Sequence, residues 1–380
     1  MGVAATIASG ASVGSFIVTN NDVPIPHPAQ RYPGSSATFY SLGPQGTLTN
    51  RSVVYTGGDG IAGGSFSYSR IAIVPQGADV CVFVSDAATN DIASISATSR
   101  AVIGNYLATA SDSGGSNGIG LVANANYLYA GFSYSTTIAT FEIQSGCTLS
   151  FVSDLFTVGL SGGTVGGMAI HGSTMVVTYG DGSVASFNIA AGTPVANNDA
   201  ENSSGSSSDH RPNGVVISAD GHYAIFGDAS TIATIEVSDI SSGKLKPTIA
   251  YNVGQGWNSS NVQLSPDNSV IFVTSSSGGE ITAAFFDKVT GRVSPGCATP
   301  PLNGFYDSWS YAGGAALQLS ASDSGYIYVP EFGGNGFSSI GVVQFTATGR
   351  QCTLTELATS PVVDNTDASS MLSIGIYQGN

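Results

Sequence analysis

The sequence predicts an all-β protein, a single seven-bladed β-propeller with four-stranded antiparallel blades that spans residues 1–380. A short phrase, an apolar strand followed by a turn and a second apolar strand, recurs at spacings of 47, 49, 47, 48, 52 and 58 residues. A four-stranded blade needs roughly 40 to 50 residues. The chain also contains 50 glycines and no sustained helical periodicity, so very little helix is expected.

Seven strand openers define this repeat. They begin at Arg70, Asn117, Gly166, Asn213, Asn261, Gly313 and Met371. A pair of β-sandwiches is the alternative architecture, but sandwiches give no reason for seven near-equal periods. The repeat therefore favours the propeller.

The unit at residues 69–109 illustrates one blade. Its four predicted strands are residues 70–74, 80–85, 92–96 and 102–107. The same order recurs in five further units, residues 117–157, 166–194, 213–253, 261–293 and 313–357. Asp220-Gly221 and Asp267-Asn268 occupy turns between first and second strands, where the backbone must adopt positive φ.

The two ends of the chain are expected to complete the seventh blade together. Residues 15–19, 37–41 and 52–56 predict a second, third and fourth strand without a first. Residues 371–377 predict a first strand without followers. Joining them closes the ring and leaves no unpaired strand edges at the closure.

The charge balance limits the partners. With 25 acidic and 10 basic residues, the net charge of -15 repels nucleic-acid phosphates and anionic membranes. We therefore expect no nucleic acid or membrane partner, and a monomer. Low lysine content and an even number of cysteines predict a secreted protein, extracellular or periplasmic. Glycosylation sequons begin at Asn50, Asn202 and Asn258.

The four cysteines predict two disulfides. Cys147, Cys297 and Cys352 occupy equivalent hairpins between third and fourth strands, and Cys81 begins a second strand on the same side. Adjacent blades bring Cys81 near Cys147 and Cys297 near Cys352, within the roughly 7 Å between Cα atoms that a disulfide needs. These bonds would be structural and would take no part in catalysis.

Two phrases carry a family resemblance. Residues 212–228 (PNGVVISADGHYAIFGD) and 262–274 (VQLSPDNSVIFVT) resemble the recurrent units of lactonase-type seven-bladed propellers, which include 6-phosphogluconolactonase-like proteins and fungal carboxy-muconate cyclases. Residues 40–48 and 286–293 look like the family's third-strand endings. The resemblance spans the chain, and it implies a small-molecule lactone as substrate.

The cyclases of that family imply a catalytic set of one His, two Arg and one Glu at the channel mouth. Arg211 and Asp228 fall where an Arg and the acid of this set are expected. The sequence around Thr164 has no His, and that at Trp257 has no Arg, so only part of the set is carried over. A sugar-lactone hydrolase is equally consistent with the resemblance.

The cluster at residues 209–213 (DHRPN) offers the sharpest catalytic hypothesis. Opening or closing a lactone needs a general base and a cation that holds the carboxylate or the developing oxyanion. His210 suits the first role and Arg211 the second, with Asp228 orienting one of them. Alternatively, Arg211 and Asp228 form an ion pair that braces neighbouring strands.

Substrate-binding residues are expected in loops that enter first strands or leave second strands, because these loops surround one mouth of the channel. The predicted set is His27, Arg31, Arg70, Asn117, Asn213, Trp257, Asn261, Trp309 and Glu331. Trp257 and Trp309 could stack on a sugar or planar ring, or simply fill gaps between blades. The polar run 197–209 predicts a lid or a solvated loop.

No cofactor is expected. The alternative is Ca²⁺ held by Asn117, Asn213 and Asn261 with Asp86 or Glu331, although Asn is also common in turns. Two functions stay open: a lactonase-like enzyme acting on a small sugar-derived or carboxylated lactone, or a non-catalytic extracellular propeller that binds a glycan or protein.

Overall fold

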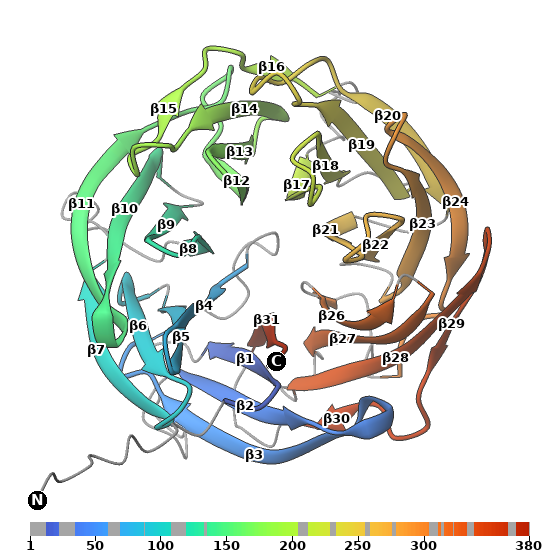
Figure 1. Cartoon of the computed structure of the whole chain (residues 1–380), viewed down its shortest axis with the longest axis horizontal. Coiled ribbons are helices and arrows are strands. Elements are labelled where there is room, and N and C mark those ends of the chain that lie inside the picture. The colour runs from blue at the N-terminus through green and yellow to red at the C-terminus, as the bar shows by residue number, and fades with distance from the viewer. Residues whose placement is uncertain are drawn as a thin grey trace, which may run out of the picture.

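The computed structural model describes residues 13–22, 35–59, 69–86, 88–107, 119–132, 135–203, 212–228, 233–254, 259–275, 279–303, 311–312, 315–321, 323–332, 338–363 and 370–379. Within these ranges the chain folds into seven antiparallel sheets that stand around a central axis as blades (Figure 1). Their only helices are two 3-10 turns, Pro44–Gly46 and Ser145–Cys147. The prediction of a seven-bladed propeller is confirmed.

The first three blades follow the chain from the axis outward. Blade one contains β4 (Ile71–Gln76), β5 (Asp79–Asp86), β6 (Asp91–Ser96) and β7 (Ala101–Leu107). Blade two contains β8 (Ile119–Ala123), β9 (Tyr127–Phe132), β10 (Thr137–Gln144) and β11 (Thr148–Phe156). Blade three contains β12 (Val165–His171), β13 (Thr174–Tyr179), β14 (Ser183–Asn188) and the short outer strands β15 (Val195–Ala196) and β16 (Glu201–Asn202).

Blades four to six repeat this order. Blade four contains β17 (Pro212–Ile217), β18 (Tyr223–Asp228), β19 (Ala233–Asp239) and β20 (Ile249–Gly254). Blade five contains β21 (Ser259–Leu264), β22 (Val270–Ser275), β23 (Ile281–Asp287) and β24 (Arg292–Ala298). Blade six contains β26 (Ala316–Ala321), β27 (Ser324–Phe332), β28 (Ser338–Thr348) and β29 (Gln351–Glu356), with β25 (Tyr311–Ala312) and β30 (Val362–Val363) as short additions.

The outer edge of blade three differs from the expectation. The polar run 197–209 is predicted as a lid or a solvated loop, yet β16 lies within it and pairs with Val184 and Ser183 of β14. Residues 204–209 lie outside the described ranges. The start of this run is therefore part of a sheet, because two residues suffice to pair with the exposed edge of β14.

The ring closes through the two chain ends. β31 (Ser370–Tyr377) pairs antiparallel with β1 (Phe16–Asp22), from Phe16 opposite Tyr377 to Asp22 opposite Ser370. Two more strands, β2 (Ser36–Leu42) and β3 (Leu48–Tyr55), complete the blade in the order β3-β2-β1-β31. The predicted closure is confirmed, and Figure 1 shows red β31 beside blue β1.

The hydrophobic core lies between blades. Buried apolar side chains of the described residues form seven clusters, each joining two neighbouring blades. Phe16 and Val18 of β1 pack against blade one, whereas Ile17 between them packs against blade six. Successive side chains of a strand point to opposite faces, so each strand serves two interfaces. This requirement explains the apolar runs in the sequence.

The turns use the residues that the sequence predicts. The Asp220 carboxylate accepts hydrogen bonds from the Ser218 hydroxyl and from the backbone N–H of His222 at 3.1 Å. Gly221 has φ of 72° and Asn268, in the corresponding turn of blade five, has φ of 62°. Gly and Asn tolerate this left-handed conformation better than other residues do.

Both predicted disulfides are present. Cys81–Cys147 joins blades one and two with Cα atoms 5.3 Å apart, and Cys297–Cys352 joins blades five and six with Cα atoms 5.7 Å apart. Both pairs link neighbouring blades, as the sequence predicts. Cys297, however, lies near the end of β24 opposite Ala283, and not in the hairpin expected between the third and fourth strands, which closes at Asp287 and Arg292. No helix among the described residues is long and apolar enough to cross a membrane.

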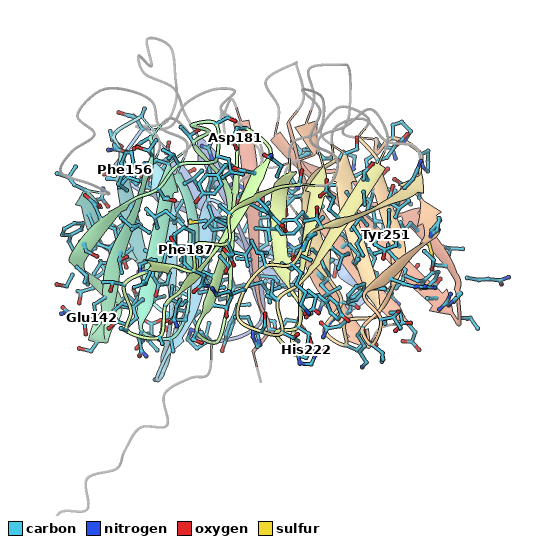
Figure 2. The ribbon with its side chains drawn as sticks, turned by 90° about the horizontal axis from the view of Figure 1, so that it is seen from above. Glu142, Phe156, Asp181, Phe187, His222 and Tyr251 are labelled. Atoms are coloured by element: carbon cyan, nitrogen blue, oxygen red, sulfur yellow. A yellow bond between two sulfur atoms is a disulfide. The ribbon has the colours of Figure 1, made fainter. Side chains whose placement is uncertain are left out.

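The propeller has two faces with different strand ends. First strands begin and second strands end at what we call the mouth face, where Figure 2 shows Asp181 and Phe156. Turns from first to second strands lie at the opposite face, where Figure 2 shows His222. His171, which ends β12, and His222 therefore lie at turns away from the mouth face.

We expect Ile374→Ala to lower the free energy of unfolding by about 2 to 5 kcal/mol, because Ile374 is buried between blades six and seven on the closing strand. Ile103→Ala is the control, since Ile103 is 42% exposed on the outer strand β7 and should change stability by no more than about 0.5 kcal/mol. Urea unfolding measures both. Equal losses for the two variants would contradict the importance of the closing strand.

The two disulfides should differ in their access to a reductant. Cys81 and Cys147 are 0% exposed, whereas Cys297 and Cys352 are only partly buried. Thiol–disulfide exchange requires access to sulfur. Under mild reductant the folded protein should therefore open Cys297–Cys352 first, and alkylation followed by peptide mass spectrometry identifies the labelled pair. Earlier labelling of Cys81 and Cys147 would show that this difference in burial does not control reduction.

Candidate functional site

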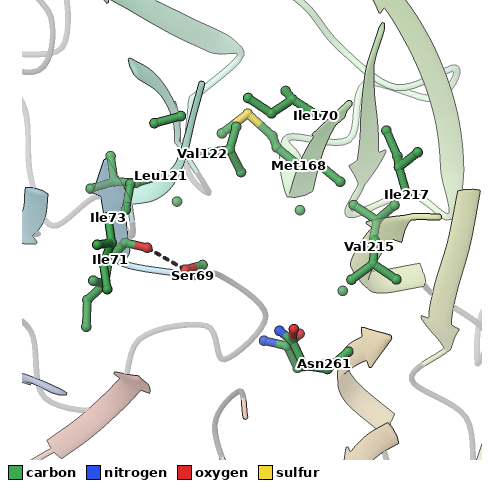
Figure 3. A pocket seen from close by; sticks show the side chains of 18 residues that line it. Ser69, Ile71, Ile73, Leu121, Val122, Met168, Ile170, Val215, Ile217 and Asn261 are labelled. Carbon is green, nitrogen blue, oxygen red and sulfur yellow. Dashed lines mark hydrogen bonds between the residues drawn. The ribbon is translucent and has the colours of Figure 1, made fainter. Parts of the chain in front are cut away.

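The inner strands of five blades surround a cavity of about 370 Å³ on the propeller axis. Its walls come from β4, β8, β12, β17 and β21, and Figure 3 shows their side chains around an open centre. A volume of this size lies in the range of small-molecule sites, roughly 300 to 1,000 Å³. The ring of blades thus creates a site that can hold a small ligand.

A second cavity of about 390 Å³ adjoins the first. It is lined from β4, β21, β26 and β31, and it shares Ile71, Ile73 and Gln263 with the first cavity. We call the two cavities together the channel. Because β31 supplies Ile374 and Ile376 to the wall, the channel exists only when the ring is closed.

Among the described residues, three supply polar side chains to the channel wall, namely Ser69, Asn261 and Gln263. Ser69 precedes β4 at the mouth face, and its hydroxyl donates to the carbonyl oxygen of Ile71 at 2.8 Å (Figure 3). Asn261, in the first half of β21, lies beside Gly214, where an added Cβ would meet the Asn261 Cα at 2.8 Å. Because Gly214 has no side chain, the backbone of Asn261 can approach β17 closely at this point.

The channel wall contains no charged residue and no histidine within the described part of the chain. Hydroxyl and amide groups can orient a ligand through hydrogen bonds, but at neutral pH they do not act as general bases. If a reaction takes place here, its base must come from outside these walls.

Most of the predicted site residues lie outside the described residues. These are His27, Arg31, Asn117, His210, Arg211, Trp257 and Trp309. Their roles stay predictions.

The backbone of blade four brings two predicted segments together. Pro212, which follows Arg211 in sequence, pairs with Asp228 across β17 and β18. Asn213 is the next residue of β17. The acid predicted to orient His210 or Arg211 thus belongs to the strand that pairs with the start of β17, at the mouth face.

Arg70 is buried at the junction of blades one and seven. Its side chain is 1% exposed, and its backbone N–H donates to the Ser373 hydroxyl on β31 at 3.0 Å. Arg70 is not part of the channel wall, whereas its neighbours Ser69 and Ile71 are. Its predicted contact with substrate stays a prediction, and the structure shows that it links the first and last strands of the closed ring.

Glu331 is also buried, in the interface of blades five and six. It is 1% exposed and accepts a hydrogen bond from the Ser339 hydroxyl at 2.9 Å. Ile327 and Val329 lie four and two residues earlier on β27 and belong to the apolar cluster of that interface, so alternation places Glu331 on the same side. Burial raises the pKa of Glu331 to about 8, and Glu356 adds to the increase.

The Ca²⁺ alternative receives no support from the residues that the structure describes. Among them, no group of three or more His, Cys, Asp or Glu side chains could hold a metal ion. Asn261 lines the channel, but Asn117 is not described, and neither Asp86 nor Glu331 is part of the channel wall. The proposed ligand set is therefore untested.

Ser69, Gln263 and the apolar channel walls are not among the residues that the sequence predicts for the site. Ser69 directly precedes the strand opener at Arg70, so its position in the repeat is a usable signal. Gln263 interrupts an apolar opener, and a polar residue at an inner-strand position is a second signal. The apolar wall residues give no such signal, since in sequence they cannot be distinguished from residues of the hydrophobic core.

No family model matches the chain, and no curated protein matches it. Solved structures do, and two of them are putative 6-phosphogluconolactonases. The one from Bacteroides uniformis is 10% identical with a TM-score of 0.67, and the match covers 96% of this chain and 99% of that one. The one from Bacteroides fragilis is 13% identical with a TM-score of 0.61, covering 98% and 100%.

A protein of unknown function from Desulfotomaculum acetoxidans is equally similar. It is 14% identical with a TM-score of 0.65, and the match covers 97% of this chain and 100% of that one. At such identities the matches show a shared fold. They agree with the resemblance noted in the sequence, and they include proteins described as lactonases.

The buried Glu331 predicts a dependence of stability on pH. Its folded pKa of about 8 exceeds the usual value of 4.5, so between these values the folded state keeps a proton that the unfolded state has lost. Stability should therefore fall as pH rises through this window, by up to about 1.4 kcal/mol per pH unit. Glu331→Gln should remove this contribution.

Urea unfolding at pH 5 and pH 8 measures the effect, with the exposed residue Glu142 changed to Gln as the control. A pH dependence that is the same in Glu331→Gln and in the unaltered protein would show that the Glu331 carboxyl is not held in its neutral form.

Proposed function

We propose that the protein is a lactonase-like enzyme that opens or closes a small sugar-derived or carboxylated lactone at the mouth of its channel. The observation that carries the proposal is the cavity of about 370 Å³, which has hydrogen-bonding side chains at Ser69, Asn261 and Gln263. Two structures with the same fold are described as putative 6-phosphogluconolactonases. The oxygens of a lactone ring need hydrogen-bond partners, and these side chains can provide them.

In the proposed reaction His210 removes a proton from water, and the water oxygen forms a bond to the lactone carbonyl carbon. The ring C–O bond then breaks, and the leaving alkoxide takes the proton back from His210, which gives the hydroxy acid and restores the base. Arg211 holds the oxyanion and later the carboxylate, and Asp228 orients His210 or Arg211. Ring closure is the reverse sequence. No covalent enzyme intermediate is required.

The proposed compartment is an oxidising one, extracellular or periplasmic. Two disulfides link neighbouring blades, and such bonds persist where thiols are not kept reduced. We propose that the protein acts there as a monomer on a small molecule, without a cofactor.

A specific observation favours a second function, a non-catalytic propeller that binds a glycan or a protein. The described channel wall holds no residue that could act as a general base. In that case the aromatic residues predicted at the mouth, Trp257 and Trp309, would provide the contact by stacking on the ligand.

Replacing His210 or Arg211 by Ala should distinguish the two. We expect the change at His210, the base, to lower kcat for lactone hydrolysis by about 10² to 10⁴-fold. The change at Arg211, which holds the oxyanion, should lower it by about 10² to 10³-fold. Hydrolysis of a panel of sugar lactones and alkyl lactones, followed by acid release, measures the effect. The control is His222→Ala, at the opposite face. Unchanged hydrolysis in both variants would remove the catalytic assignment.

If the unaltered protein hydrolyses no lactone, a glycan-binding measurement tests the second function. Binding that is lost in Trp257→Ala or Trp309→Ala would establish the non-catalytic function.

A further inference from the structure

The channel walls differ in chemistry along the propeller axis. Ser69 and Asn261 lie near the mouth face, whereas Ile73, Ile170 and Ile217 lie nearer the other ends of their strands, and Gln263 is the one polar side chain at that depth among the described wall residues. We propose that the channel binds the aliphatic chain of a lactone that carries an alkyl or acyl substituent. The inference deepens the proposed function and rests on it for the lactone ring.

Partly exposed aliphatic side chains form the deeper wall. Val122, Ile170 and Ile217 come from blades two, three and four, and each lines the cavity while keeping contact with solvent. Leu317 and Ile376, also partly exposed, continue this surface on blades six and seven. Apolar surface that faces water gains free energy when an apolar ligand covers it, so this wall favours a hydrocarbon chain.

The wall disfavours a phosphorylated substrate. Among the described residues that line the two cavities, none is a Lys, Arg or His. Moving a charged phosphate from water into a space without cations is strongly unfavourable. A neutral chain carries no such penalty, so the described channel selects against the phosphosugars and for a substituted aliphatic lactone.

Three glycines recur at one level of the channel wall. Gly120, Gly167 and Gly214 line the first cavity from three consecutive blades and are each 47 residues apart (167 − 120 and 214 − 167). At Gly214 an added Cβ would lie 2.8 Å from the Asn261 Cα, so a larger residue would displace the polar group at the mouth. At this level the described wall of these three blades is formed by backbone.

The experiment measures binding separately from turnover. Ring amides (γ-lactams) with ethyl, hexyl or decyl substituents resemble the substituted lactones but resist hydrolysis, and calorimetry gives their association constants. We expect the constant to rise by up to about four-fold for each added methylene until the channel is filled. The double variant Val122→Thr with Val216→Thr adds two hydroxyls to the wall at almost constant shape and should flatten this rise.

Val152→Thr with Val195→Thr is the matched control, because these valines are 43% and 60% exposed on outer strands. It should keep the full dependence on chain length. An association constant independent of chain length, a dependence retained in the Val122/Val216 variant, or tighter binding of 6-phosphogluconate than of the decyl lactam would each overturn the inference.

The two proposals can fail separately. If lactam binding depends on chain length but no lactone is hydrolysed, the aliphatic binding site is supported and the proposed enzymatic function is contradicted. If lactones are hydrolysed but chain length affects neither binding nor turnover, the enzymatic function is supported and the aliphatic binding site is contradicted.

Discussion

The pairing of β31 with β1 is the constraint on which the other features depend. Seven sheets can share seven interfaces only if the last blade meets the first, and this pairing supplies the inner strand of blade seven. The same strand donates Ile374 and Ile376 to the channel wall, and its Ser373 hydroxyl accepts a hydrogen bond from the backbone of Arg70. Closure, core and channel are therefore products of one set of contacts.

The shared use of each strand also determines how a site can be built. Both faces of a blade pack against neighbours, so polar groups at the interfaces must be neutral or hydrogen bonded. Glu331 meets this requirement through its raised pKa and its bond from Ser339. Polar side chains that can contact a ligand are therefore confined to the inner edge of each blade and to the loops of the mouth face. The predicted catalytic residues lie in those loops.

The blade count, the closure and the disulfides could be predicted because repeated units repeat their contacts. Cys81 and Cys147 lie in neighbouring blades, so the repeat alone places them together. The burial of Arg70 and Glu331 could not be predicted, because a residue at a strand end faces either the mouth or the adjacent blade. Glu331 faces the adjacent blade because it alternates along β27 in step with Ile327 and Val329. The register of β27 is in turn fixed only by its pairing with β28.

The channel could not be predicted for a related reason. Met168 and Ala169 both line the channel, yet Met168 is partly exposed whereas Ala169 is buried between blades three and four, and the sequence contains no feature that distinguishes them. Because wall residues also belong to interfaces, selectivity and stability are coupled. Ile71 illustrates this, since it lines both cavities and is 4% exposed within the cluster of blades seven and one. Val122 and Val216 keep more contact with solvent, so the polarity of the channel can change there with less loss of packing.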